Sequence, residues 1–353
     1  MCKKNIYMHL PIIATVYPFY TCNLKCHCCF TEYATSDVNS TRIVTNPVEF
    51  SNRLKNLGIK VVELLGGEPF LNREFLYRFI DKCEENNIGI ILSTNGTLIN
   101  NHDIKFIKSK SLLKIQISID SFHESINMQS RNADQVTKVR NTLRLFEKNN
   151  ICYQITTVAN KANLKCLTST FLVELNKLSF LERLHIIRIL PSSNELLFEN
   201  LRISNKEYFQ LIQVLQQNED EMNFTIGIDS SYEFHNQEEV ESLIQFKKIA
   251  HSCEAGRYQI TISPNGDILA CDMLSDSVFS NIFIDSKDDF LVKWNSSDIL
   301  KKFRERDFFN SEVECSNCNA LEICGSCLFL CEKLNNEPIS KSPYCLIDFW
   351  KNK

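Results

Sequence analysis

Short apolar runs alternate with longer amphipathic stretches along the first 190 residues of the chain. The apolar runs have the length and β-branched content of strands, whereas the stretches between them repeat apolar positions every three or four residues, as helices do. Six runs are expected to be strands, at residues 12–18, 61–66, 89–94, 113–119, 151–159 and 184–190, and stretches such as 47–58, 75–87, 135–150 and 165–178 are expected to be helices. This alternation predicts an α/β fold with a parallel sheet covered by helices.

The pattern changes after residue 190. Residues 191–250 are polar with helical periodicity and contain no strand of comparable strength, so we expect a helical bridge there. Two alternating runs around a Pro-Asn-Gly turn then predict a β-hairpin within residues 258–273. The tail beyond it is rich in cysteine and weakly periodic, which is typical where metal replaces a hydrophobic core. We therefore predict three parts, at 1–190, 191–250 and 251–353.

The composition is that of a globular protein and narrows the set of partners. The chain has 353 residues, of which 44% are hydrophobic and 23% charged. Its formal net charge of −4 argues against nucleic acid as the main partner. His9, Pro11 and Pro18 interrupt the apolar N-terminal run, and no run approaches the ~20 apolar residues of a membrane-spanning helix. We expect a cytoplasmic protein without nucleic-acid or membrane partners.

Sixteen cysteines are the most informative part of the composition. Because reducing compartments do not support a disulfide framework, clustered cysteines there indicate metal binding. Cys22, Cys26 and Cys29 follow the first predicted strand, at the end where parallel sheets bind ligands. Three thiolates are one short of the four that hold a [4Fe–4S] cluster, so one iron would keep an open site. A zinc site or idle thiols remain alternatives for this loop by itself, and Cys28 is spare.

A second motif stands at the end of the second predicted strand, which runs into Gly66, Gly67, Glu68 and Pro69. Two glycines let a ligand approach the backbone, and the Glu68 carboxylate could take an ammonium group. A simple strand-to-helix turn is the alternative. Together with the CxxxCxxC loop, this turn resembles the signature of the radical S-adenosylmethionine (SAM) superfamily.

The resemblance implies a partial (β/α)6 TIM-type barrel with a [4Fe–4S] cluster on Cys22, Cys26 and Cys29 and SAM at the open iron. In this family, residues near the ribose and carboxylate of SAM follow the strands. The cofactor-binding residues that the resemblance implies are Gly66, Gly67, Glu68, Pro69, Thr94, Ser118, Asp120 and Arg131. Helix N-caps or surface groups are the alternatives for the polar ones. Cys28 stands where the family usually has an aromatic residue, which departs from the pattern.

The C-terminal cysteines resemble the SPASM extension of radical SAM enzymes, which carries auxiliary iron–sulfur clusters. They are Cys253, Cys271, Cys315, Cys318, Cys324, Cys327, Cys331 and Cys345, and eight thiolates are what two [4Fe–4S] clusters need. The resemblance implies one or two auxiliary clusters in an α+β domain. We expect an outer cluster on Cys315, Cys318, Cys324 and Cys345, and an inner one on Cys253, Cys271 and Cys327, with Cys331 as the candidate for its fourth ligand.

The spacing of the tail departs from the common SPASM pattern at one point. Two residues separate Cys324 from Cys327, where the common pattern has three. A Cys-x2-Cys ending also occurs in members that resemble haem-biosynthesis enzymes. For the tail by itself, a zinc ribbon is the alternative.

The resemblance implies reductive cleavage of SAM to methionine and a 5′-deoxyadenosyl radical that abstracts a hydrogen atom from the substrate. A donor such as flavodoxin or ferredoxin would supply the electron. SPASM enzymes mostly modify peptides or proteins, so we expect a ribosomal-peptide maturase. Only 21 residues precede the cysteine loop, too few for a separate leader-recognition domain, so we expect either a leader-peptide-binding protein as a partner or a barrel that binds the peptide itself.

The sequence is also compatible with other functions. Asp272 resembles in position the proton acceptor of anaerobic sulfatase maturases, although a hairpin-end aspartate that bonds its own backbone is the simpler interpretation. An anaerobic sulfatase maturase and a haem-precursor enzyme are the alternative activities. A non-catalytic iron–sulfur or zinc scaffold is the alternative of a different class.

Overall fold

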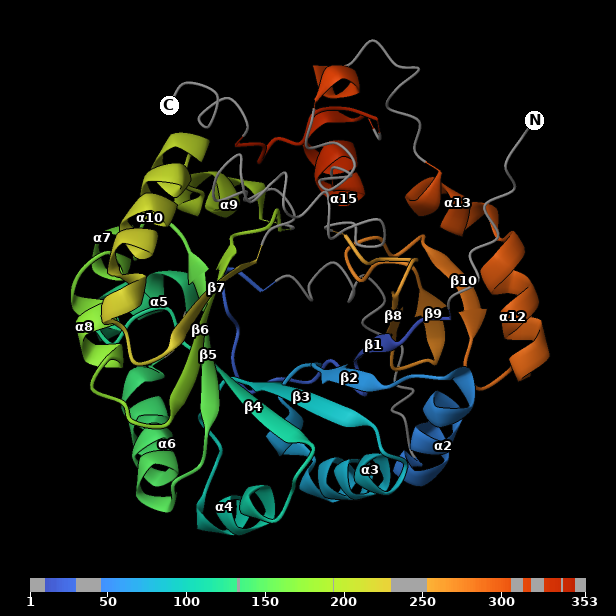
Figure 1. The fold of residues 1–353 in the computed structure, drawn as a ribbon, viewed down its shortest axis with the longest axis horizontal. Helices are drawn as coiled ribbons and strands as arrows, with labels where there is room; N and C mark the ends of the chain where they lie inside the picture. Colours follow the sequence, from blue (N-terminus) through green and yellow to red (C-terminus); the bar gives the residue numbers. More distant parts are fainter. Residues whose placement is uncertain are drawn as a thin grey trace. The chain divides into compact units, whose positions relative to one another are not determined.

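A computed structural model gives the fold of the chain (Figure 1). It describes residues 10–29, 46–131, 134–192, 194–229, 253–305, 314–318, 327–337 and 339–346. The chain divides into two compact units. The first comprises Met1–Asn23, Thr31–Gln116 and Glu254–Glu305, and the second comprises Leu24–Phe30, Ile117–Cys253 and Arg306–Lys353. The three parts predicted from the sequence, 1–190, 191–250 and 251–353, stay a prediction.

All six predicted strands are present, which confirms the α/β fold class. They are β1 (Ile13–Val16), β2 (Val61–Leu64), β3 (Gly89–Thr94), β4 (Leu113–Ser118), β5 (Tyr153–Ala159) and β6 (Leu181–Arg188). In the first unit β1, β2 and β3 pair in parallel, and in the second β5 and β6 do so. The hydrogen-bonded order of the described strands is β10-β9-β8-β1-β2-β3-β4-β5-β6-β7.

One strand contradicts the sequence prediction for residues 191–250. Helices α9 (Glu195–Leu201) and α10 (Asn205–Asn218) confirm the helical character of this region. However, β7 (Thr225–Asp229) follows them and pairs in parallel with β6, so the expectation of no further strand was wrong. The run TIGID is short and follows an acidic stretch, so its alternation does not stand out. Its stabilisation comes from hydrogen bonds to β6 rather than from local preference.

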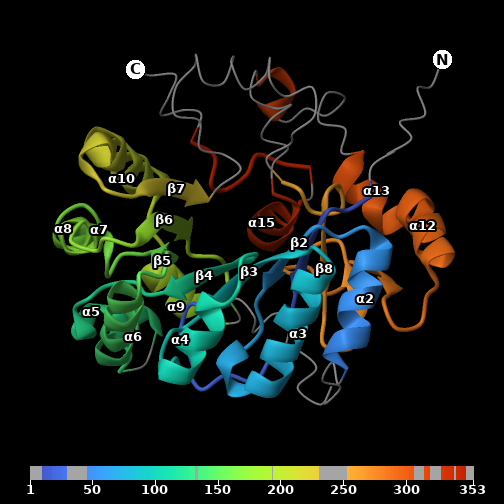
Figure 2. The same ribbon diagram turned by 60° about the horizontal axis from the view of Figure 1, so that its bottom comes forward.

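The helices that connect the strands bury apolar side chains, except α5, whose buried residues are the polar Asn127 and Ser130. They are α2 (Pro47–Leu57), α3 (Arg73–Glu85), α4 (Asn101–Lys108), α5 (Glu124–Arg131), α6 (Val136–Asn149), α7 (Leu164–Leu167) and α8 (Thr170–Leu175). Helices α2 and α3 lie side by side (Figure 2), and the rings of Phe50 and Phe79 stack between them with centroids 5.4 Å apart. Asparagine side chains cap the N-termini of α2, α3 and α4, which satisfies amides that a helix leaves without partners.

The predicted hairpin is confirmed and extends the sheet of the first unit. Strands β8 (Gln259–Ile262) and β9 (Asp267–Leu269) are antiparallel, with Gly266 between them at φ +83°. Strand β8 also pairs in parallel with β1. Strand β10 (Val278–Asn281) follows β9, and α12 (Lys287–Ser296) and α13 (Asp298–Arg304) come next. The edge of β1 is therefore covered by chain from beyond residue 253.

The described part of the tail contains little regular structure, as its weak periodicity predicted. It has three short helical segments, η3 (Glu314–Asn317), α15 (Leu328–Leu330) and η4 (Cys331–Asn335). Within the described ranges, none of the helices combines the length and apolarity that crossing a bilayer requires.

A buried carboxylate joins α3 to α4 in the first unit. Asp103 is fully buried and accepts hydrogen bonds from Arg73 Nε at 2.8 Å, Tyr77 and the Asn100 amide at 2.7 Å. Burial opposes its ionisation, but these donors and the Arg73 charge outweigh burial, so the pKa of Asp103 lies below its ordinary value of 3.8.

We predict that Asp103→Asn lowers the free energy of unfolding by about 2 kcal/mol near neutral pH, because charge-assisted hydrogen bonds are lost. Because the pKa of Asp103 is lower in the folded chain than its ordinary value of 3.8, the ionised carboxylate stabilises the fold fully above pH 3.8. This stabilisation is lost as the pH falls through the folded-state pKa. Urea denaturation at a series of pH values should therefore show the difference between parent and variant shrinking in acid. Glu74→Gln, at an exposed position of the neighbouring helix α3, is the control. An equal loss in both variants would contradict this account.

Candidate active site

The first half of the cysteine loop, up to Asn23, belongs to the first unit and is held by the segment that follows β3. Cys22 is exposed, and its Sγ accepts a hydrogen bond from Asn95 Nδ2 at 3.9 Å. The same amide group donates to Asn23 Oδ1 at 2.9 Å, and Asn23 Nδ2 donates to Thr97 Oγ1 at 2.9 Å. The end of β3 therefore positions the start of the loop.

The glycine turn after β2 packs directly on the residues that precede Cys22. The Gly67 amide donates to Phe19 O at 3.0 Å, and the Glu68 amide donates to Thr21 O at 2.9 Å. A Cβ at Gly67 would lie 1.9 Å from Thr21 O, and one at Gly66 would lie 2.8 Å from Phe19 O. Gly66 also has φ +120°, which favours glycine. Both glycines are thus required by the chain's own backbone, and contact with a ligand stays a prediction for them.

Glu68 joins the ends of β2 and β3. Its side chain is fully buried, with Oε1 accepting from Thr94 Oγ1 at 2.7 Å and from the Phe70 amide at 3.0 Å. Oε2 accepts from the Asn95 amide at 2.8 Å. Burial raises the pKa of Glu68, and the hydrogen bonds oppose that rise. Pro69 begins the short helix η1 (Pro69–Leu71), whose N-cap is Glu68. The structure therefore brings together the predicted residues Glu68 and Thr94.

The second half of the cysteine loop belongs to the second unit and is held by the end of α5. The Cys29 amide donates to Cys26 O at 3.3 Å, and the Cys28 amide donates to Ser130 O at 3.2 Å. His27 Nδ1 donates to Gln129 O at 3.1 Å. Cys26, Cys28 and Cys29 are half-buried. Burial raises the pKa of the Cys28 thiol, and the charge of Arg131 opposes that rise.

Asp120 and Arg131 form a buried ion pair beyond the end of β4. Arg131 Nε donates to Asp120 Oδ2 and Nη2 donates to Oδ1, each at 2.8 Å. Asp120 is fully buried and also accepts from the Val158 amide at 2.8 Å. Two-point contact of this kind fixes the plane of the guanidinium. Ser118 is half-buried, and its carbonyl accepts from Gln135 Nε2 at 2.8 Å.

Asp272 lies in the first unit with a tyrosine from the other end of the sequence. Tyr17 is buried, and its hydroxyl donates to Asp272 Oδ2 at 2.8 Å. Cys271 Sγ lies 3.8 Å from Asp272 Oδ1. Burial raises the pKa of Asp272, and the Tyr17 hydrogen bond opposes that rise. Asp272 therefore has a partner beyond its own backbone, although its role stays a prediction.

The described cysteines of the tail in the second unit gather in part. Burial raises the pKa of Cys315 to about 11, and the charges of Cys345, Cys318 and Cys331 contribute to the rise. The Cys318 amide donates to Cys315 O at 3.0 Å. Cys331 is fully buried, and its thiol donates to Ser340 O at 3.4 Å, whereas Cys327 is half-buried.

The structure says less about the other predicted ligands of the auxiliary clusters. Cys324 lies outside the described residues. Cys253 and Cys271 are half-buried. In the part of the chain that the structure describes, no three cysteine, histidine or carboxylate side chains are grouped as ligands of a metal ion. The ligand assignments therefore stay predictions.

The exposure of the thiols is nevertheless compatible with iron–sulfur ligation. Cys22 is exposed and Cys26 and Cys29 are half-buried, so their sulfur atoms are accessible. Cys83 is fully buried and Cys166 is 6% exposed, as expected of structural thiols. Thiolate sulfur is the donor that such clusters require. The three cysteines of the loop thus differ in exposure from Cys83 and Cys166, whereas Cys152 is exposed and the predicted ligand Cys331 is fully buried.

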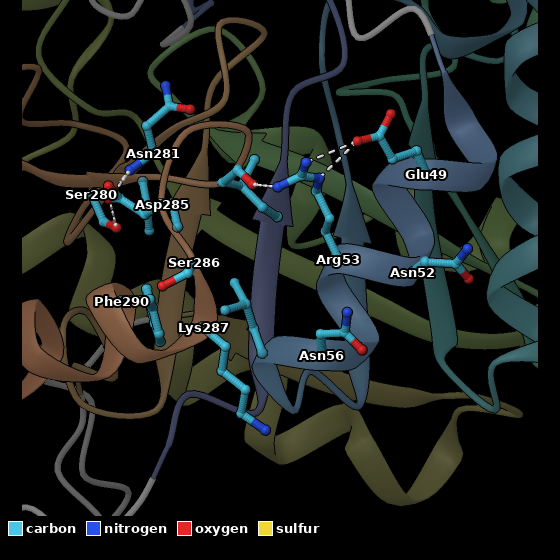
Figure 3. A pocket seen from close by; sticks show the side chains of 13 residues that line it. Glu49, Asn52, Arg53, Asn56, Ser280, Asn281, Asp285, Ser286, Lys287 and Phe290 are labelled. Atoms are coloured by element: carbon cyan, nitrogen blue, oxygen red, sulfur yellow. Dashed lines mark hydrogen bonds and ion pairs between the residues drawn. The ribbon is translucent and has the colours of Figure 1, made fainter.

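A separate cavity of about 380 Å³ lies within the first unit (Figure 3). It lies between α2 and the segment from β10 to α12, and its lining contains none of the predicted site residues. Arg53 lines it but already donates to Glu49 at 3.0 Å and to Ile282 O at 2.8 Å. Asp285 likewise accepts from Lys293 at 2.6 Å. These charges are used to hold the fold together.

Sequence reasoning missed two residues of the candidate site. Asn95 stands beside Thr94 in the polar run that ends β3, so its position was a usable signal. Tyr17 stands in the apolar run YPFY directly after β1 and gave no polar signal. Its partner Asp272 is 255 residues away, a separation that no local pattern reveals.

Two family models match the chain. Residues 16–171 match the model of the radical SAM superfamily. Residues 253–319 match SPASM, described as an iron–sulfur cluster-binding domain. The first match contains Cys22, Cys26 and Cys29, and the second contains Cys253, Cys271, Cys315 and Cys318 but ends before the other four cysteines of the tail.

Curated relatives are similar over most of their length. AdoMet-dependent heme synthase of Methanosarcina barkeri is 20% identical over 338 residues, covering 92% of this chain and 93% of that protein. Mycofactocin maturase of Mycolicibacterium smegmatis is 24% identical over 323 residues, covering 90% and 78%. The cysteine-type anaerobic sulfatase-maturating enzyme of Clostridium novyi is 23% identical over 278 residues, covering 74% and 71%.

Solved structures share the fold at low sequence identity. SuiB of Streptococcus suis bound to its precursor peptide SuiA has a TM-score of 0.74 and 19% identity, covering 95% of this chain and 74% of that one. Native anSMEcpe with bound AdoMet has a TM-score of 0.71 and 19% identity, covering 97% and 100%. These likenesses concern the fold.

The motifs, the fold and the two family models agree. The cofactors of such a chain are SAM and [4Fe–4S] clusters, as predicted from the cysteine loop and the tail. The chain is an enzyme of the radical SAM superfamily with a C-terminal SPASM iron–sulfur cluster-binding domain.

Proposed function

We propose that this enzyme modifies a peptide or protein and acts as a ribosomal-peptide maturase. The observation that carries the proposal is the glycine turn packed against the entry to the cysteine loop at Phe19 and Thr21, which supplies a scaffold for SAM cleavage. A peptide substrate is supported by the likeness to mycofactocin maturase and to SuiB with its precursor peptide. An electron donor such as flavodoxin or ferredoxin and a leader-peptide-binding protein complete the proposed set of partners.

Cys22, Cys26 and Cys29 are the proposed ligands of the cluster that binds SAM. When bound, the cluster and SAM supply a 5′-deoxyadenosyl radical that abstracts hydrogen from the substrate. The protein's own part is to hold the ligands before the cofactors bind. Asn95 contributes to this by contacting Cys22 and bonding to Glu68.

Arg131 is the proposed partner of the SAM carboxylate, and Asp120 is its positioning residue. Asp120 engages Nε and Nη2, so the guanidinium is oriented before SAM arrives. Ser118 precedes this pair at the end of β4 and is the proposed contact for the ribose. Glu68 and Thr94 hold the glycine turn in the conformation that SAM would meet.

The auxiliary clusters are proposed to use the cysteines of the tail. Cys315, Cys318, Cys324 and Cys345 are assigned to the outer cluster, and Cys253 and Cys271 to the inner one. Cys327 is preferred over Cys331 for the inner cluster. The Cys331 thiol is buried against the Ser340 carbonyl, whereas Cys327 is more accessible.

The Tyr17–Asp272 pair favours a second candidate function, an anaerobic sulfatase maturase. Oxidation of a cysteine or serine to formylglycine needs a group that accepts a proton, and an aspartate oriented by a buried tyrosine suits that role. The likeness to the Clostridium novyi enzyme supports the same candidate. A haem-precursor substrate remains the third candidate, supported by the similarity to heme synthase.

Peptides encoded beside the gene would test the proposal directly. Reconstituted enzyme, dithionite and SAM should change the mass of such a peptide in parallel with 5′-deoxyadenosine formation, and the Cys29→Ala variant should do neither. A cysteine-containing sulfatase peptide forms the second arm. Formylglycine on that peptide, with the encoded peptides unchanged, would replace the first candidate by the second. If the enzyme turned over a porphyrin precursor and neither peptide, both the first and the second candidate would be excluded.

Cys28 and Cys29 should differ sharply although they are adjacent. We predict that Cys29→Ala abolishes SAM cleavage because a cluster ligand is lost, whereas Cys28→Ala keeps it because Cys28 is spare. Anaerobic assays of 5′-deoxyadenosine and of iron per chain measure the difference. Cys152→Ala, which removes an exposed thiol elsewhere, is the control. The reverse pattern would mean that the ligands are assigned in the wrong register.

A further inference from the structure

A buried arginine at the end of β6 lies beneath the segment that leads to Cys345. Arg188 is the last residue of β6 and is 5% exposed. Its Cζ lies 3.7 Å from the ring centroid of Tyr344 and 4.4 Å from that of Tyr208. Guanidinium groups are attracted to aromatic faces at such distances, more strongly when buried. Arg188 thus connects β6, α10 and the tail within the second unit.

Hydrogen bonds extend this contact to the backbone on both sides of Tyr344. Arg188 Nη2 donates to Asn205 Oδ1 at 2.8 Å, and Nη1 donates to Tyr344 O at 3.3 Å. The amide nitrogen of Asn205 then donates to Pro343 O at 3.0 Å and to Cys345 O at 3.2 Å. A guanidinium can only donate hydrogen bonds, so the carboxamide oxygen of Asn205 must face Arg188. The NH2 group of Asn205 therefore points toward the tail.

The side chain of Tyr344 also holds the tail in place. Tyr344 is 5% exposed, and its hydroxyl donates to Ile189 O at 2.6 Å. The Cys345 amide donates to Ser342 O at 3.0 Å, which closes a turn. The backbone and the side chain of the residue before Cys345 are therefore both fixed. These contacts limit the directions in which the Cys345 thiol can point.

Cys345 is half-buried and is one of the proposed ligands of the outer cluster. Groups that orient a metal ligand without touching the metal commonly decide how firmly the site is held.

We propose that Arg188 is a positioning residue for an auxiliary cluster, acting through Asn205 and Tyr344 to place the Cys345 thiolate. This inference rests on the proposed assignment of Cys345 as a cluster ligand. It assigns a task to a buried cation whose contacts include the Tyr344 carbonyl, the Asn205 carboxamide oxygen and two aromatic rings. It also predicts that a change at β6 affects a cluster bound by the tail.

The test measures how fast iron leaves the auxiliary clusters. Full-length protein carrying Cys22→Ala, Cys26→Ala and Cys29→Ala would bind iron only in the tail, and release to a chelator is followed anaerobically. Adding Arg188→Met should speed release about tenfold, the lower end of the effect of losing an outer-shell partner. Arg202→Met is the matched control, since Arg202 pairs with Glu199 at the surface and lies over Phe198.

A second variant separates positioning from folding. Asn205→Asp keeps an oxygen for Arg188 and suits the first position of α10, but it cannot donate to Pro343 and Cys345. It should keep the thermal midpoint of its parent and still release iron about tenfold faster. If Arg188→Met does not fold, the iron-release rate of Asn205→Asp tests the inference by itself.

Two results would overturn the inference in distinguishable ways. Parental release rates in Asn205→Asp and Arg188→Met, with rapid release in Cys345→Ser, would show that Cys345 is a ligand but needs no positioning by Arg188. A parental rate in Cys345→Ser itself would remove the assignment of Cys345 and the inference with it. Retention of SAM cleavage by the chain with its native cysteine loop would show that the proposed function survives either result.

Discussion

The close contact between Gly67 and the carbonyl of Thr21 is the constraint on which the candidate site depends. The glycine turn after β2 donates backbone hydrogen bonds to carbonyls of the residues after β1, at a separation that leaves no room for a Cβ. This contact fixes where the chain enters the cysteine loop, and Asn95 then holds Cys22 from the end of β3. Cys22, the first of the proposed metal ligands, is therefore placed by the parallel strands of the first unit.

Two buried carboxylates organise the strand ends in different units. Glu68 accepts hydrogen bonds from Thr94 and Asn95 in the first unit, and Asp120 accepts from Arg131 and Val158 in the second. The sequence suggested that both bind the cofactor. Their hydrogen bonds give each carboxylate a related role, which is to position neighbouring groups. A buried carboxylate whose oxygens are hydrogen-bonded holds its neighbours in one orientation, so those groups lose little mobility when the cofactor binds. Arg188 and Asn205 are proposed to do the same for the tail.

The sequence predicted elements whose signals are local and missed those that depend on distant partners. Six strands were recognised because buried parallel strands are nearly continuous apolar runs. Strand β7 was missed because its five residues are stabilised by pairing with β6. The cysteine spacing and the GGEP turn led to the family because the chemistry restricts residue type and spacing. The partners of Glu68, Asp272 and Arg188 were not predictable, since strand ends meet only in the folded chain.

Substitution of Gly67 by alanine tests the central claim most directly. A Cβ there would lie 1.9 Å from Thr21 O and must displace the entry to the cysteine loop. Gly89→Ala is the matched control, because a Cβ at Gly89 has its nearest neighbour at 3.9 Å. With dithionite and SAM, the Gly67→Ala enzyme should form 5′-deoxyadenosine about 100-fold more slowly than the parent, while Gly89→Ala should match the parent. Formation at the parental rate in Gly67→Ala would contradict the account.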